Sequence, residues 1–224
     1  SLREELAKHI PVEETGFVIA DSLAYKRFLK MRPNFETQGY HLLKEWEITG
    51  KKNGKPDLEK LARYERELGG EAGLFGALVA DRRIFMGPDC TYTQDYRRRF
   101  SDDEMLCILQ QGLERTEALF EHLKPEVVVS FICVTMLDYL VYLFAKARGV
   151  RVLNLRPTRV GDRVGFSGVL NDPSPEFAQA YKRILETGKS DYFEEAEKYI
   201  RRVRSRSAWR RRRCSCVRRW VGAP

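Results

Sequence analysis

The stretch that decides the fold is KPEVVVSFICVTMLDYLVYLFAKARGVRVLNLRPTRVGDRVGFS, residues 124–167. It begins with an apolar run rich in valine, which is typical of a parallel strand buried on both faces. Thr135 then predicts the cap of a helix that ends at Gly149, and VRVLNL (150–155) predicts a second strand. A strand, a helix and a strand joined by short links predict a right-handed βαβ unit.

The same alternation continues before and after this unit. Residues 16–20 predict a short strand, and Ser22 predicts the cap of a helix that reaches about Met31. Ser101 and Glu104 have the spacing of a capping box that opens a long helix. Residues 40–49 fit a strand or a helix, and further helices are predicted over 57–68, over 175–187 and from 191 onward. The pattern predicts an α/β fold, a single Rossmann-like three-layer domain over residues 1–200 with a mainly parallel sheet.

The charge of the chain is concentrated at one end. Residues 201–224 hold ten arginines and no acidic residue, so the net charge of +8 becomes −2 for residues 1–200. A tail with arginine, serine and tryptophan but no lysine is typical of an out-of-frame reading of GC-rich DNA, and we expect it to be out of frame or disordered. Arginine arms can also bind nucleic acid, but the nearly neutral body disfavours that function.

The sequence lacks the common motifs for metal binding and for nucleotide binding. The pair Cys214 and Cys216 has the wrong spacing for a zinc motif, and His9, His41 and His122 are far apart and match no metal-ligand spacing. Neither GxGxxG nor GxxxxGK[ST] occurs, which argues against the usual modes of nucleotide binding. We therefore expect no metal site and no cofactor.

Ligands bind parallel sheets at the carboxyl ends of their strands, and candidate residues follow three strands. Asp21 follows the strand at 16–20, where it could act as a base or simply lie beside a helix cap. Ser130 ends the next strand as a weak catalytic candidate, because the GxSxG elbow of serine hydrolases is absent. Thr135 stands at a helix N-terminus whose N–H groups and dipole could hold a phosphate.

Three arginines follow the strand at 150–155. Arg156, Arg159 and Arg163 could clamp a phosphate or a carboxylate with paired N–H bonds. They could equally order the loop by pairing with nearby acids such as Asp162 and Asp172. The sequence leaves both interpretations open.

Four segments together resemble a known family. They are YHLLKEWEIT (40–49), KPDLEKLARYERELGG (55–70), LVADRRIF (78–85) and the stretch 124–167 quoted above. In this order they resemble the N-terminal half of bacterial surface or capsular polysaccharide biosynthesis proteins of the two-domain, GT-B type of glycosyltransferase. The resemblance spans roughly residues 15–185 and rests on a diffuse pattern without a short diagnostic motif.

The resemblance implies a partner and a location. In such enzymes the N-terminal Rossmann-like domain contacts the acceptor, a glycan or a lipid-linked sugar, and the C-terminal domain binds the nucleotide sugar. A chain of 224 residues is too short for both, so we expect no transfer by this chain alone and nucleotide-sugar binding only with a second domain. The implied location is cytoplasmic, with peripheral association at the inner face of the membrane. The alternative is a non-catalytic α/β module that binds a phosphorylated or acidic small ligand through the same arginines.

Overall fold

A computed structural model describes residues 2–50, 54–69, 73–81, 84, 100–131, 133–158, 163–169 and 175–205. The chain divides into two compact units. The first comprises residues 1–156 and 166–170, and the second comprises residues 157–165 and 171–224. A single domain over residues 1–200 stays a prediction. The tail beyond residue 205, and the loop predicted at 87–100 except for Phe100, lie outside the described residues.

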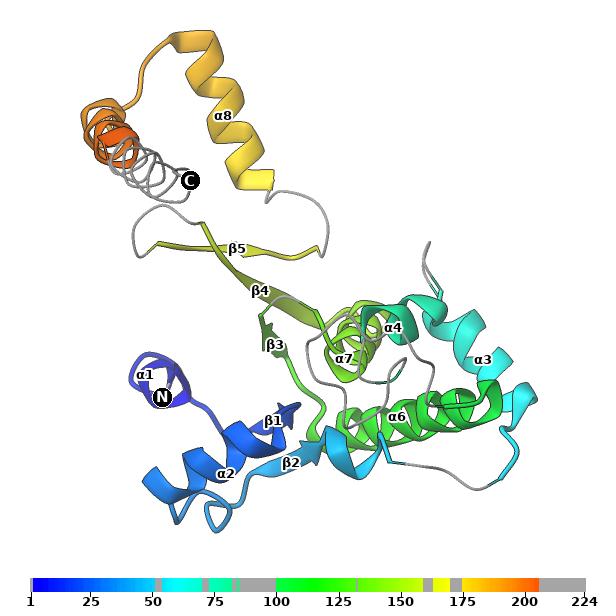
Figure 1. Cartoon of the computed structure of the whole chain (residues 1–224). Helices are drawn as coiled ribbons and strands as arrows, with labels where there is room; N and C mark the ends of the chain where they lie inside the picture. Colours follow the sequence, from blue (N-terminus) through cyan, green and yellow to red (C-terminus); the bar gives the residue numbers. More distant parts are fainter. Residues whose placement is uncertain are drawn as a thin grey trace, which may run out of the picture. The chain divides into compact units, whose positions relative to one another are not determined.

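The elements confirm a mixed α/β chain (Figure 1). In chain order they are α1 (Leu2–Leu6), β1 (Gly16–Ile19), α2 (Ser22–Met31), β2 (His41–Lys44), the short helix η1 (Glu45–Glu47), α3 (Leu58–Leu68), α4 (Phe75–Ala80), α6 (Asp102–Leu123), β3 (Val127–Ser130), α7 (Met136–Ala147), β4 (Arg151–Pro157), β5 (Val164–Ser167) and α8 (Pro175–Thr187). Residues 193–205 are also helical. The ambiguous segment 40–49 is therefore a strand followed by a 3-10 turn.

The described strands form two small sheets. In the first, β1 pairs with β2 in parallel, with Gly16 opposite His41. In the second, the order is β3-β4-β5, and β3 runs parallel to β4 with Ser130 opposite Asn154. The predicted strand–helix–strand unit is thus confirmed as β3, α7 and β4, although one continuous sheet is not seen in the described residues.

One face of β3 is exposed, so the prediction of a strand buried on both faces was wrong. Val127 and Val129 are 45% and 38% exposed, whereas Val128 between them packs against the core. Side chains alternate between the two faces of a strand, and the described helices bury only the face that carries Val128. A continuous apolar run cannot distinguish burial on one face from burial on two.

Local sequence signals set the ends of the long helix α6. The side chain of Ser101 accepts a hydrogen bond from the Glu104 N–H, and Glu104 accepts one from the Ser101 N–H, which confirms the capping box. At the other end Lys124 adopts the left-handed conformation, with φ of 43°, directly before Pro125. A residue before proline is disfavoured in the helical region, so the helix stops there.

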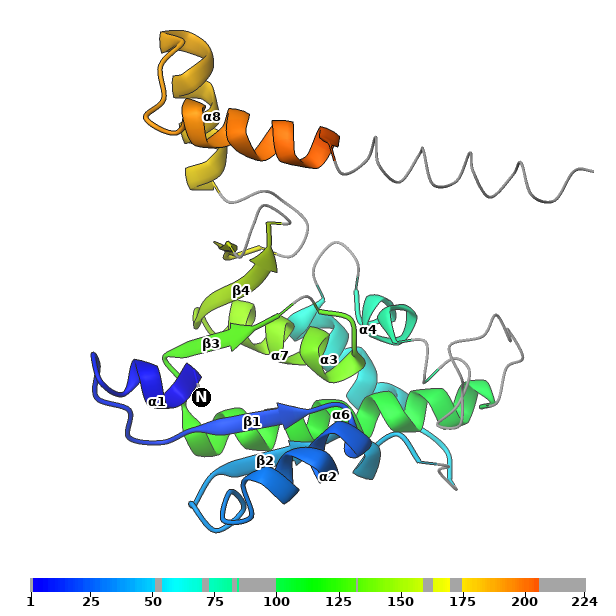
Figure 2. The same ribbon diagram turned by 60° about the vertical axis from the view of Figure 1, so that its left-hand side comes forward.

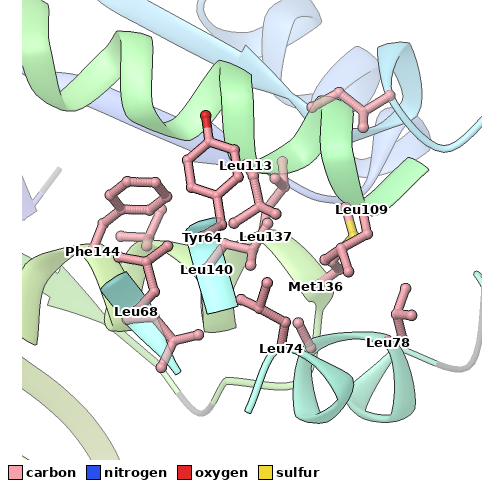
Figure 3. Packing of buried hydrophobic residues seen from close by; sticks show 14 of the residues in the cluster. Tyr64, Leu68, Leu74, Leu78, Leu109, Leu113, Met136, Leu137, Leu140 and Phe144 are labelled. Carbon is pink, nitrogen blue, oxygen red and sulfur yellow. The ribbon is translucent and has the colours of Figure 1, made fainter. Parts of the chain in front are cut away.

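The core of the first unit lies between α6, α7, α3 and α4 (Figure 3). Gly112 is in the middle of α6, and a Cβ atom there would approach the Met136 Cε atom to 2.8 Å and the Leu140 Cδ1 atom to 3.0 Å. The absence of a side chain therefore lets α6 and α7 pack closely. Leu113, Leu137 and Leu140 are fully buried at this contact.

In the second unit, the ion pair between Arg163 and Glu195 links the residue before β5 to the helix at 193–205. The structure describes all of α8, and no side chain in that helix is buried. Within the described part of the whole chain, no helix has both the length and the apolar composition needed to cross a bilayer.

Candidate functional site

Ser130 is the last residue of β3 and forms a polar pair with Asn154, the middle residue of β4, which lies opposite it in register. The Ser130 hydroxyl lies against Oδ1 of Asn154, which is only 1% exposed. The Nδ2 atom of Asn154 is buried and has no hydrogen-bond partner among the described residues. Buried amide groups are normally satisfied, so this donor lacks the hydrogen bond that a buried amide usually makes to protein, water or ligand.

Arg156 extends this pair along β4. It stands two residues after Asn154, and residues at this spacing lie on the same face of a strand. The arginine is half-buried, and its Nη2 atom donates to the carbonyl oxygen of Val169 at 3.3 Å. That bond uses one of several guanidinium donors, so the others can reach an anion bound at the strand ends. We call Ser130, Asn154 and Arg156 the strand-end site.

Cys133 lies beside the strand-end site as a neutral thiol. Burial is the largest cause that raises its pKa to about 12, and the negative charge of Asp138 adds to this. A hydrogen bond with Ser130 and the positive charge of Arg156 lower the pKa by smaller amounts, which shows that both groups are close. Because thiolates are the reactive form of cysteine, the raised pKa makes Cys133 a weak nucleophile at neutral pH.

This neutral state predicts slow alkylation of Cys133. In a variant whose other four cysteines are serines, reaction with iodoacetamide near pH 8 should be about a thousandfold slower than for a thiol with the ordinary pKa of 9.0. The rate is followed by mass spectrometry, and the same variant in denaturant should react like free cysteine. A folded-state rate close to that of free cysteine would contradict the assignment.

The N-terminus of α7 is occupied by protein oxygen atoms. Its first three N–H groups donate to Asp81 at 3.1 Å, to Glu45 at 3.4 Å and to Thr135 at 3.2 Å. Asp81 and Glu45 are both buried. An anion at this helix end would therefore compete with two buried carboxylates. In the structure Thr135 caps the N-terminus of α7. Phosphate binding by Thr135 stays a prediction.

Sequence reasoning missed both of these carboxylates. Each one is an acidic residue next to apolar side chains, Glu45 in YHLLKEWEIT and Asp81 in LVADRRIF. Acidic residues are almost never fully buried unless they are paired, so no local rule marks them as buried. The only available signal was a preceding apolar run, which ends directly before Asp81 and is separated from Glu45 by Lys44.

Asp21 caps α2 in place of Ser22, which corrects the predicted cap. Its Oδ1 atom accepts from the N–H groups of Leu23 and Ala24, both at 2.9 Å. Ser22 is the first residue of the helix itself. The carboxylate of Asp21 is thus engaged locally, and its use as a base stays a prediction.

The described residues do not test the predicted arginine clamp. Arg156 belongs to the first unit and Arg163 to the second, and Arg159 lies outside the described residues together with Asp162 and Asp172. Arg163 pairs with Glu195, an acid that the sequence analysis did not consider. A three-arginine clamp therefore stays a prediction, and Arg156 is the member that adjoins the strand-end site.

The strand-end site is equipped to bind a ligand rather than to attack one. Among the described residues the Ser130 hydroxyl contacts Phe131, Cys133 and Asn154, and none of these is an imidazole or a carboxylate that could activate it as a nucleophile. Hydroxyl, amide and guanidinium groups instead match ligands that carry hydroxyls and a negative charge.

No family model, no curated protein and no solved structure matches this chain.

Proposed function

We propose that this chain is the acceptor-side, three-layer Rossmann-like domain of a glycosyltransferase-like protein in bacterial surface polysaccharide biosynthesis. It binds an acidic or phosphate-linked sugar acceptor at the strand-end site. The observation that carries the proposal is the buried Nδ2 atom of Asn154, which has no partner in the described chain. Arg156 follows two residues later on the same strand, and Ser130 lies opposite Asn154 at the end of β3. The sequence resemblance supplies the class of protein.

The chemistry of the site supports a binding role. The Arg156 guanidinium suits a phosphate or carboxylate, and Asn154 and Ser130 suit sugar hydroxyls. Since the described contacts of Ser130 include no base, this domain would position the acceptor, and a second domain would hold the nucleotide sugar. In the proposal the chain works at the inner face of the membrane by peripheral association with a lipid-linked acceptor.

The same contacts favour one second candidate, a non-catalytic module for a phosphorylated or acidic small ligand. Arg156 would dominate in that case, and the sugar and lipid portions of a ligand would add no affinity. The two functions are therefore separated by comparing a lipid-linked sugar phosphate with inorganic phosphate.

The test is calorimetric titration of the full chain with a short-chain polyprenyl-phosphate sugar and, separately, with inorganic phosphate. Arg156→Ala should weaken binding of the sugar phosphate about 10- to 100-fold, since a hydrogen bond to a charged group contributes about 1.5–3 kcal/mol. Arg151→Ala is the matched control, because this exposed arginine begins the same strand at its opposite end.

Three outcomes distinguish the acceptor role, the small-ligand role and the absence of a site. Tight binding that only Arg156→Ala weakens supports the acceptor role. Equal affinity for inorganic phosphate and the sugar phosphate favours the small-ligand module. Absence of binding, or an equal loss in both variants, contradicts the proposed site.

A further inference from the structure

Two of the three histidines lie close to a carboxylate in the first unit. One oxygen of Glu14 and one nitrogen each of His41 and His122 lie within 4.8 Å of one another. The His41 Nε2 atom is 3.8 Å from the Glu14 Oε2 atom, and the two imidazole centroids are 4.4 Å apart. The sequence spacing predicted no such cluster, because its members come from distant parts of the chain.

Three elements converge to build this cluster. His41 is the first residue of β2 and is paired with Gly16 of β1, which places Glu14 two residues before that pair. His122 lies in the last turn of α6. A Cβ atom on Gly16 would come within 2.5 Å of the Leu123 Cδ1 atom, so the glycine lets β1 lie directly against the end of α6. Figure 2 shows β1 and β2 alongside α6.

The ligand atoms of Glu14, His41 and His122 are of the types that zinc prefers in proteins. Two imidazoles and one carboxylate form a known ligand set of zinc sites, with a water in the fourth position. Tetrahedral coordination at metal distances of about 2.0 Å places ligand atoms about 3.3 Å apart. The His41–Glu14 separation of 3.8 Å exceeds this by about half an ångström, which a small side-chain movement can close. The side chains of His41 and Glu14 are 33% and 58% exposed, so an ion and a water can reach them.

We propose that Glu14, His41 and His122 bind one divalent metal ion of the zinc type. The ion would join the segment before β1 to β2 and α6, and so stabilise the first unit. Metal binding only to the folded state raises stability by mass action. This inference goes beyond the acceptor-binding function and does not depend on it.

The test uses the full chain with Cys214→Ser and Cys216→Ser, so that these two thiols cannot compete for the metal. Titration with Zn²⁺, followed by calorimetry and thermal unfolding, should give one ion per chain. Tm should rise by about 5–10 °C at a free Zn²⁺ concentration of 100 times Kd. His122→Gln should weaken binding more than about tenfold and remove most of this rise.

His9→Gln is the matched control, because His9 is the one histidine outside the cluster and is exposed. It should leave both the stoichiometry and the rise in Tm unchanged. Glu14→Gln is the second site variant, and because Glu14 is exposed it keeps the test valid if His122→Gln folds poorly. The proposal is overturned if the parent does not bind Zn²⁺, or if binding survives in both site variants.

Discussion

Replacing Tyr64 by alanine should lower the free energy of unfolding by about 3–5 kcal/mol, the cost of removing a buried aromatic side chain. Tyr64 is 1% exposed, and its ring lies 6.2 Å from that of Phe144 in the core between α3, α6 and α7 (Figure 3). Its hydroxyl donates to the Glu117 Oε2 atom at 2.5 Å. The substitution thus leaves a cavity and removes a hydrogen bond to a carboxylate.

Equilibrium urea denaturation measures this effect. Tyr64→Phe keeps the ring and should cost about 1.5–3 kcal/mol, the net contribution of one hydrogen bond to a charged group. Tyr181→Ala is the control for loss of a tyrosine at the surface, since Tyr181 is 63% exposed, and it should change stability by less than about 0.5 kcal/mol. Equal losses for Tyr64→Ala and Tyr181→Ala would show that Tyr64 is not part of the core.

Asp81→Ala should lower the free energy of unfolding by about 2–3 kcal/mol, because it leaves a buried donor without its charged acceptor. Asp81 is buried and accepts the N–H of Met136, which is itself fully buried, at the start of α7. A carboxylate is also favoured there by the positive end of the helix dipole. Loss of this contact should loosen the first turn of α7 next to the strand-end site.

Urea denaturation combined with amide hydrogen exchange in α7 tests this prediction. Asp81→Asn retains an oxygen acceptor and should cost less than Asp81→Ala, which separates the hydrogen bond from the charge. Asp191→Ala removes an exposed aspartate and should stay within about 0.5 kcal/mol of the parent. If Asp81→Ala is as mild as Asp191→Ala, the carboxylate does not hold α7.

The βαβ unit was predictable because each of its signals is local. Thr135 caps α7, and Gly149 adopts a φ of 66° just after the helix, a conformation that favours glycine. The exposed face of β3 was not predictable, since burial on one face or two depends on which elements cover the sheet. The separation of the strands into two sheets is set by the same long-range packing.

The strand-end site was predictable in part. Ser130 and Arg156 follow from the rule that ligands bind at the carboxyl ends of parallel strands. Asn154 was missed, although a polar residue within the apolar strand VRVLNL was a usable signal. The buried positions of Asp81 and Glu45 could not be predicted from the local sequence. These residues lie 55 and 92 positions before the residues whose N–H groups donate hydrogen bonds to them.

The cluster of Glu14, His41 and His122 could not be predicted from the local sequence either. His41 and His122 are in contact only because β2 pairs with β1, and β1 lies against the end of α6. Motif spacing detects ligands within one element or one loop, and here the ligands come from the segment before β1, from β2 and from α6. The pairing of β1 with β2 therefore had to be known before the site could be recognised.

Amide NMR titration of the full chain with the polyprenyl-phosphate sugar locates the bound ligand. Binding at Ser130, Asn154 and Arg156 predicts that the largest shift changes fall on residues 130–135 and 154–156, and that Arg156→Ala abolishes them. Changes confined to other segments, such as the arginine-rich residues 201–224, with these residues unaffected, would contradict it.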